Sequence, residues 1–329
     1  KKLMTIKSFY RYSAYTLLVL LFWCFSWYIT RPTMESVGIE YLEKVPVTNK
    51  QVTVKWLGIT TLLIDDGETQ IITDGFFSRP SLFDVLFSRG LQSDPLFIKA
   101  ALSELSIDKL AAIVPVHSHY DHAMDSAVVA ELTGAKILGS FSTANIAKSS
   151  NLAESQIIIA DTGKAYKFGK FSVTLIESRH APLDTNRKID GVVTRPFVLP
   201  APWTAWQQGK AYSIYIVHPQ GKILIQGSAG FIPEKLKDIK ADIVFLGVGG
   251  LGSLSDAYRD EYIFEVVKRV MPSLIVPIHH DNLFGIYGEV EQHPLMIEFT
   301  ERSAQDLMRL IHPVDLKQLR FAKPTVLFD

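Results

Sequence analysis

The sequence is poor in cysteine, because its 329 residues include only Cys24. A single cysteine excludes a disulfide within the chain, and it also excludes a zinc site built from several thiolates. A metal site in this chain would have to use histidine nitrogens and carboxylate oxygens instead.

The chain also lacks an excess of either charge. Lys and Arg number 34, as do Asp and Glu, and no long basic run occurs. Without a net positive field, we do not expect a nucleic-acid partner. The apolar fraction of 47% and the charged fraction of 21% are typical of a globular protein. The length permits one or two domains.

Charge is missing altogether from residues 12–30, near the N-terminus. A membrane span needs roughly 20 apolar residues, so we predict one transmembrane helix over residues 12–30, after a short basic tail at residues 1–11. The alternative is a signal peptide, but no small-x-small cleavage site follows, which favours an uncleaved anchor.

The basic tail also predicts the orientation of this single-pass anchor. Basic residues collect on the cytoplasmic side, so the N-terminus would be cytoplasmic and the rest extracytoplasmic, or periplasmic in a bacterium. Residues 31–48 contain Pro32 and Pro46 without periodicity and are predicted to form a linker. Residues 49–329 are then the folded domain.

Short strand patterns open this domain at residues 52–58, 61–65 and 69–74, with a turn signal at Asp66-Gly67. Strand and helix patterns alternate through the middle of the chain, and hairpin-like pairs follow at residues 165–176 and 212–226. This order predicts an α/β fold in which two packed mixed sheets are covered by helices.

The richest chemistry lies in residues 117–122, His-Ser-His-Tyr-Asp-His, directly after the apolar run 111–116. Such a run predicts a buried strand that carries these side chains at its carboxyl end. His117 and His119 are two apart, so an extended chain would point both to the same side. Imidazoles and a carboxylate are the ligands that zinc prefers.

Further histidines follow other apolar strands. His180 comes after the strand pattern 171–176, and His279 and His280 come after 275–278. Because strand ends of one sheet meet at one edge, these are the natural further ligands. The remaining three each precede proline and are assigned to loops: His218, His293 and His312.

With these residues in place, the chain resembles the metallo-β-lactamase fold superfamily. The resemblance rests on His-x-His-x-Asp-His at 117–122, Asp74 before it, and His180 and His279 after it, and it covers about residues 50–285. The opening strands are similar to the branch that contains ascorbate-6-phosphate lactonase and N-acylphosphatidylethanolamine phospholipase D. The resemblance implies an αββα sandwich with one or two Zn²⁺ ions at the rim between the sheets.

The resemblance also implies the division of ligands. His117, His119 and His180 would hold the first metal, and Asp121, His122 and His279 the second. Asp74 and His280 are expected to act as weak ligands or to support the ligands from behind. Family members usually carry a bridging aspartate in a Gly-Asp-x-Gly turn, where this chain has Ser228. A neutral serine is a weaker donor, so the second site is expected to hold its metal less firmly.

The expected reaction is hydrolysis by a metal-bound hydroxide, with Asp121 as the catalytic residue that orients it or relays its proton. An aromatic, proline-rich stretch and an aromatic loop at residues 76–87, together with the predicted membrane anchor, predict a lipid-like or acylated substrate. A phosphodiester or acyl-lipid hydrolase is the leading interpretation. A lactonase is one alternative. A non-catalytic metal-binding or interaction protein, indicated by Ser228, is the other. The predicted substrate-binding residues are Tyr120, Phe197, Trp203 and Trp206.

Overall fold

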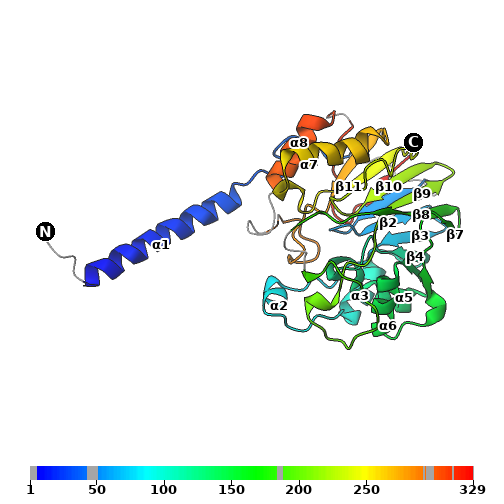
Figure 1. Cartoon of the computed structure of the whole chain (residues 1–329), viewed down its shortest axis with the longest axis horizontal. Coiled ribbons are helices and arrows are strands. Elements are labelled where there is room, and N and C mark those ends of the chain that lie inside the picture. Colours follow the sequence, from blue (N-terminus) through cyan, green and yellow to red (C-terminus); the bar gives the residue numbers. More distant parts are fainter. Residues whose placement is uncertain are drawn as a thin grey trace.

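The structure, a computed structural model, describes residues 6–42, 51–183, 188–291, 293, 300–312 and 315–328. Two stacked sheets form its centre, with helices on both outer faces (Figure 1). Within these residues the fold is the αββα sandwich that the sequence predicted.

The first sheet is antiparallel at one side and parallel at the other. Its strands, in spatial order, are β13 (Thr325–Val326), β1 (Thr53–Trp56), β2 (Leu62–Asp65), β3 (Gln70–Thr73), β4 (Leu110–Val114), β5 (Lys136–Gly139) and β6 (Ile157–Ile159). The predicted opening strands and the turn at Asp66-Gly67 are thus present.

The second sheet is also mixed, with parallel pairing from β12 to β10 and antiparallel pairing from β10 to β7. Its strands, in spatial order, are β12 (Leu274–Ile278), β11 (Ile243–Gly247), β10 (Gly221–Gln226), β9 (Ala211–His218), β8 (Phe171–Ser178) and β7 (Ala165–Phe168).

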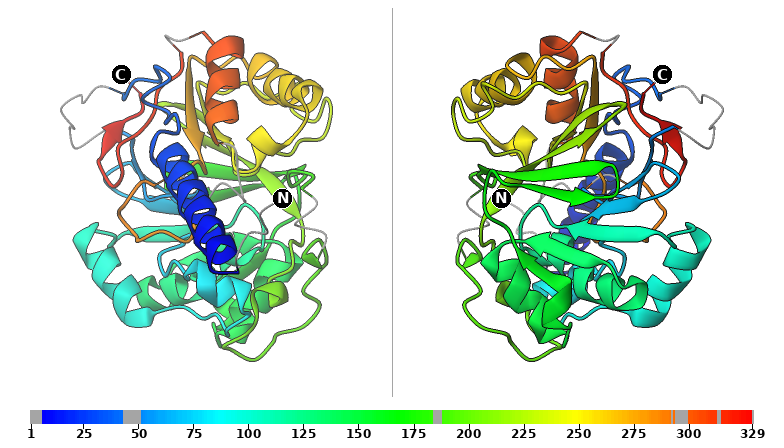
Figure 2. Two further views of the ribbon diagram at one scale, coloured as in Figure 1. Left: turned by 90° about the vertical axis from the view of Figure 1, so that its left-hand side faces the viewer. Right: turned by 90° about the vertical axis from the view of Figure 1, so that its right-hand side faces the viewer.

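Helices cover the outer face of each sheet, as Figures 1 and 2 show. Below the first sheet lie α2 (Leu82–Leu86), α3 (Pro95–Glu104), α5 (Ser126–Thr133) and α6 (Phe141–Ser149), and α4 (Tyr120–Ala123) is a single turn at the rim. Above the second sheet lie α7 (Asp256–Ile263), which continues as a π-helical turn (Phe264–Lys268), and α8 (Thr300–Leu310). Short 3₁₀ turns occupy Glu154–Gln156, Trp203–Ala205 and Leu251–Ser253.

The strand that precedes the histidine motif is apolar on both faces because both faces are covered. Ala112 and Val114 of β4 pack between the two sheets, while Ile113 packs outward against α3 and α5. A continuous apolar run is the pattern that such a strand requires. The polar residues that follow it are therefore brought to the rim of the sandwich.

The N-terminal segment differs from its prediction. Residues 6–29 form α1 (Ile6–Ile29), which projects away from the sandwich (Figure 1). Among the helices of the described residues, however, none combines the length and the apolar character that crossing a membrane requires. The predicted transmembrane helix over residues 12–30 is therefore unsupported.

The predicted linker is packed rather than loose as far as residue 42. Met34 and Ile39 are buried in the core beside α8, and Arg31 is buried as well. The backbone of residues 40–42 pairs with Gln318, whose amide also donates to the carbonyl of Ile39 at 2.5 Å. The linker prediction is wrong for residues 31–42. Met34 and Ile39 are buried in the core, and this burial holds the segment in place although it contains Pro32. Residues 43–48 lie outside the described residues.

Candidate metal centre

Five strand ends meet at one rim of the sandwich and supply the polar side chains there. From the first sheet, β3 leads into Asp74 and β4 into the motif at residues 117–122. From the second sheet, β8 leads into His180, β10 into Ser228 and β12 into His279. The strand-end rule used on the sequence therefore placed these side chains at the correct edge.

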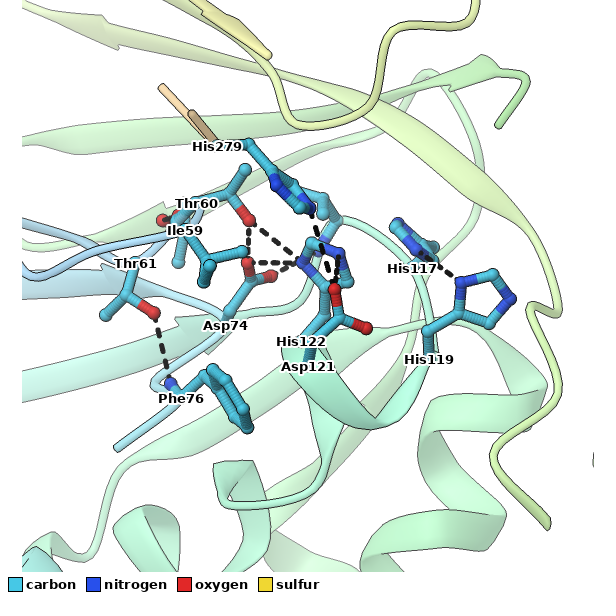
Figure 3. A network of polar contacts seen from close by, with 12 residues as sticks. Ile59, Thr60, Thr61, Asp74, Phe76, His117, His119, Asp121, His122 and His279 are labelled. Carbon is cyan, nitrogen blue, oxygen red and sulfur yellow. Dashed lines mark hydrogen bonds and ion pairs between the residues drawn. The ribbon is translucent and has the colours of Figure 1, made fainter. Parts of the chain in front are cut away.

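The first cluster contains three imidazoles. His117, His119 and His180 offer ligand atoms that all lie within 4.8 Å of one another. The Nε2 of His117 lies 3.0 Å from the Nδ1 of His119, and Figure 3 shows the two rings side by side. Nδ1 of His180 lies 2.9 Å from the carbonyl of Ala181, a contact that fixes the ring orientation.

These three imidazoles are held in their neutral form. Burial lowers the pKa of His119 to about 3 and that of His180 to about 4, and it lowers the pKa of His117 well below its ordinary value. Neighbouring imidazoles add to the effect, since each disfavours a positive charge on the next. The cluster can therefore offer lone pairs to a cation at neutral pH without first releasing protons.

The second cluster contains Asp121, His122 and His279, whose ligand atoms also lie within 4.8 Å of one another. An oxygen of Asp121 lies 3.3 Å from the Nε2 of His122 and 3.6 Å from the Nε2 of His279. In Figure 3, His279 reaches the site from the opposite side to Asp121 and His122, which share one helical turn.

Asp74 supports this second cluster from behind. One carboxylate oxygen lies 2.8 Å from the Nδ1 of His122, and the other accepts from the backbone amide of Val116 at 2.8 Å. Thr60 donates to the same carboxylate and lies 2.9 Å from the Nδ1 of His122. A carboxylate behind a ligand histidine fixes the ring and raises its basicity. The sequence predicts Asp74 to be a weak ligand or a support, and the geometry favours the support.

Two carboxylates give His122 the opposite electrostatic character to the first cluster. Burial lowers its pKa, but Asp121 and Asp74 outweigh burial and raise the pKa to about 10. Burial raises the pKa of Asp121, but His122 and His279 outweigh it and hold that pKa well below its usual range. His122 therefore holds its second proton at neutral pH, beside the carboxyl groups of Asp121 and Asp74.

His279 adopts a backbone conformation that is unusual for its residue type. Its φ is 60°, and its amide donates to the carbonyl of Ile59 at 2.9 Å. A left-handed conformation at a residue other than glycine costs about 1–3 kcal/mol and is typical of functional sites. A Cβ at Gly249 would lie 2.5 Å from the Nδ1 of His279, so glycine is needed there to admit the ring.

His280 lies outside the site, which corrects its prediction as a weak ligand. Its ring packs against that of Trp56 in a tilted arrangement, with ring centroids 4.9 Å apart, and borders separate small cavities beside Tyr41 and Gln318. Because His279 has a left-handed backbone conformation, the side chains of His279 and His280 point to different sides. Ser228, in contrast, does lie at the site, but its Oγ accepts from the backbone amide of Ala181 at 3.0 Å.

The donor set fits a divalent cation. The Nε2 of His117 lies 3.0 Å from the Nδ1 of His119, and an oxygen of Asp121 lies within 3.6 Å of the Nε2 atoms of His122 and His279. Buried donor atoms gathered this closely are stabilised when a cation binds among them. Five imidazoles and a carboxylate suit zinc, and they also suit iron, copper or nickel.

A cavity of about 270 Å³ opens above both clusters. Its polar floor includes His119, Asp121 and His180, and its wall is largely apolar, with aliphatic side chains from α2 and the loops. The wall-forming residues are Leu82, Val85, Leu86, Leu183, Ile189, Leu283 and Phe284. Among the described residues, no lysine or arginine borders it.

Of the four predicted substrate-binding residues, two line this cavity, Tyr120 and Trp203. Phe197 and Trp206 pack on each other in the neighbouring core, with ring centroids 5.1 Å apart, so that part of the prediction is wrong. In the loop at residues 76–87, Leu82 and Leu86 line the cavity, whereas Phe83 and Phe87 are exposed.

The structure adds His293, which the sequence assigns to a loop. It is buried and lines the cavity, and its ring centroid lies 6.3 Å from that of His279. Burial lowers its pKa to about 3. His218, also assigned to a loop, ends β9 and lies 3.4 Å from Asp66.

Comparisons with known proteins agree with this architecture. Residues 53–279 match the family described as Beta-lactamase superfamily domain. A UPF0173 metal-dependent hydrolase of Pyrobaculum arsenaticum is 22% identical over 261 residues, which cover 78% of this chain and 96% of that protein. A UPF0173 metal-dependent hydrolase of Myxococcus xanthus is 33% identical over 89 residues, covering 27% of this chain and 30% of that protein.

Solved structures share the fold. The isothiocyanate hydrolase from Delia radicum gut bacteria superposes with a TM-score of 0.51 at 14% identity, covering 84% of this chain and 99% of that one. CmlA, a diiron β-hydroxylase from Streptomyces venezuelae, superposes with a TM-score of 0.55 at 11% identity, covering 86% and 55%. The match over residues 53–279 and the two-sheet sandwich with its rim clusters show that this chain belongs to the metallo-β-lactamase superfamily.

Proposed function

We propose that this protein is a zinc-dependent hydrolase of uncharged acyl compounds, such as carboxylic esters or lactones, that carry a compact apolar group. The observation that carries the proposal is the cavity. Its floor holds the two ligand clusters, and its wall is apolar and borders no lysine or arginine among the described residues.

The apolar wall favours an acyl substrate over a phosphodiester. A phosphodiester is an anion, and phosphate sites in proteins normally use arginine, lysine or helix N-termini. A volume of about 270 Å³ accommodates a short acyl group rather than a long lipid chain. Leu82, Leu86 and Trp203 would contact that group.

His117, His119 and His180 would hold the first zinc ion, and Asp121, His122 and His279 the second, more weakly bound one. Bound zinc supplies a Lewis acid and lowers the pKa of water at the site. Asp121 stays ionised on the cavity floor, where its carboxylate can accept a hydrogen bond from the attacking water and orient it. The wall excludes other water from the reacting group.

The test compares three probes on the full chain after chelation and after reloading with zinc: 4-nitrophenyl butyrate, N-butanoyl-homoserine lactone and bis(4-nitrophenyl) phosphate. We expect the ester or the lactone to be hydrolysed at least about tenfold faster than the phosphodiester, and chelation to abolish hydrolysis. Preference for the phosphodiester, or full activity in the chelated protein, would overturn the proposal.

Asp121→Asn tests the role of the carboxylate. Loss of a group that orients or accepts a proton costs about 10²–10⁴-fold in kcat. Asp108→Asn, at an exposed carboxylate away from the cavity, is the matched control and should leave kcat unchanged.

A further inference from the structure

His280 borders space that the metal centre does not use. Its side chain is 6% exposed, and it lines two small cavities of about 170 Å³ each. Among the described residues, neither cavity shares a lining residue with the larger cavity above the ligand clusters. Within the same residues nothing hydrogen-bonds to either ring nitrogen of His280, and both nitrogens keep some accessible surface. Since buried polar groups normally have partners, this imidazole points to a ligand in the space beside it.

One of the two cavities has aromatic walls and is called the Trp56 cavity here. Trp56, Tyr41 and Phe321 line it together with His280. The ring centroids of Trp56 and His280 are 4.9 Å apart, and the rings of Trp56 and Phe321 meet edge to face with centroids 6.3 Å apart. A cavity of ~150 Å³ accommodates a ligand of the size of benzene. The size and the walls of the Trp56 cavity therefore fit one aromatic ring.

Two cations border the same cavity. Arg320 and Lys323 both line it, and the guanidinium carbon of Arg320 lies 3.9 Å from the ring centroid of Tyr41. In the part of the chain that the structure describes, neither cationic side chain forms an ion pair with a carboxylate. Glu35 and Glu291 border the other cavity instead. The Trp56 cavity therefore offers unpaired positive charge, and a planar guanidinium can bind a carboxylate through two parallel hydrogen bonds.

We propose that the Trp56 cavity is a second ligand site, separate from the metal centre, and that it binds a small aromatic carboxylate. The ring of the ligand would lie against Trp56 and Phe321, and its carboxylate would bind Arg320 and Lys323. A ring nitrogen of His280 would hydrogen-bond to a polar substituent such as a hydroxyl group. The proposal is independent of the proposed function, because the two cavities share no lining residue among those described.

The first experiment titrates three probes by calorimetry into the full chain loaded with zinc. We expect 4-hydroxybenzoate to bind saturably, with one molecule per chain. The uncharged 4-hydroxybenzamide and the non-aromatic cyclohexanecarboxylate should each bind at least about tenfold more weakly, because the first lacks the charge and the second lacks the ring. No saturable binding of 4-hydroxybenzoate, or equal affinity for the amide, would overturn the proposal.

The second experiment replaces residues of the Trp56 cavity. Arg320→Gln should weaken the binding of 4-hydroxybenzoate about tenfold, whereas Lys167→Gln, at an exposed lysine of β7 that does not line this cavity, should leave it unchanged. His280→Phe keeps a ring beside Trp56, removes both nitrogens and should also cost about tenfold. Arg320 is exposed, so its variant remains informative if the substitution of buried His280 prevents folding. Wild-type affinity in Arg320→Gln would overturn the proposal.

A third variant separates the Trp56 cavity from the metal centre, since a carboxylate can also bind zinc. His117→Ala removes a ligand of the first cluster and should leave the affinity for 4-hydroxybenzoate unchanged, because His117 does not line the Trp56 cavity. If His117→Ala abolishes binding and Arg320→Gln does not, the carboxylate binds at the metal centre and the second site is wrong. This result concerns binding alone, so it is distinguishable from failure of the proposed hydrolysis.

Discussion

The two ligand clusters lie side by side at one rim and differ in charge, support and backbone strain. His117, His119 and His180 are neutral imidazoles at neutral pH, each with one ring N–H and one nitrogen lone pair. In the second cluster, His122 carries a proton between two carboxylates, and His279 sits on a left-handed backbone. The first cluster is thus ready to bind a cation, whereas the second must release a proton to do so.

The electrostatic difference between the two clusters also bears on Ser228, which comes from the second sheet. The turn after β10 supplies Ser228 to the same cavity, and its hydroxyl accepts from the amide of Ala181, the residue after His180. A neutral hydroxyl adds no negative charge to balance a second cation. Two sites of one protein can therefore differ strongly in affinity although their ligands are equally close together.

The largest expected effect is the difference between removing one ligand of the first cluster and removing one ligand of the second. His117→Ala removes a ligand of the first cluster, so we expect loss of the tightly bound zinc ion and a fall in activity of about 10³-fold. His279→Ala leaves the first cluster intact and should lower activity by about 10–100-fold. Elemental analysis and kcat on both variants give the comparison. Equal zinc loss in both would show that the clusters act as one.

Asp74→Asn tests the support behind the second cluster. The amide cannot hold His122 as the carboxylate does, so the weaker zinc ion should bind about 10–100-fold less tightly, while the tighter one is unchanged. Zinc titration against a competing chelator measures both. Asp66→Asn is the control, since Asp66 is also a buried carboxylate beside a histidine but lies at the other end of β3. A loss of affinity in the control would point to general destabilisation.

The pH dependence of zinc binding should also differ between the clusters. The pKa of His122 is about 10, so zinc must displace its proton throughout the range from pH 7 to 9, and the affinity of the second ion should rise about tenfold per pH unit. The imidazoles of the first cluster, with pKa values of about 3 and 4 for two of them, are neutral over that range, so the first affinity should stay flat. Calorimetric titrations at three pH values measure both slopes. If both zinc affinities depended on pH with the same slope, the assignment of a protonated His122 to the second cluster would be wrong.

The smallest change concerns Ser228. Ser228→Asp adds an anionic donor and should strengthen binding of the second ion about tenfold, or ~1.4 kcal/mol. Ser228→Ala should leave both zinc affinities unchanged and lower stability by about 1 kcal/mol, because the amide of Ala181 loses its partner. Thermal unfolding and zinc titration distinguish these results. If Ser228→Asp does not raise the affinity for the second ion, backbone strain at His279 rather than missing negative charge would limit that affinity.

The features that were predicted from sequence are local ones. The motif at residues 117–122 needs only its own spacing and the apolar strand before it. His180 and His279 follow recognisable strands, and strand ends converge in any sandwich of this type. The order of strands and helices could be predicted for the same reason, although β11 was missed as a short apolar run between glycines and polar residues.

The features that were missed depend on contacts between distant parts of the chain. His293 lies in a loop before a proline, and nothing nearby shows that Arg31, 262 positions earlier, fixes its carbonyl. Phe197 and Trp206 have the same apolar character whether they face a substrate or a core. His279 was predicted as the ligand by resemblance, but the left-handed backbone that this residue adopts is not visible in any periodicity.

The six clustered side chains come from opposite layers of the sandwich. Four follow β4 of the first sheet, whereas His180 and His279 follow β8 and β12 of the second. A cation bound by both sets acts as a cross-link between the layers, so its binding free energy adds to the free energy that holds the two sheets together at this rim. Separation of the layers and release of the metal then become one event, and a chelator acts on this protein as a denaturant of that rim.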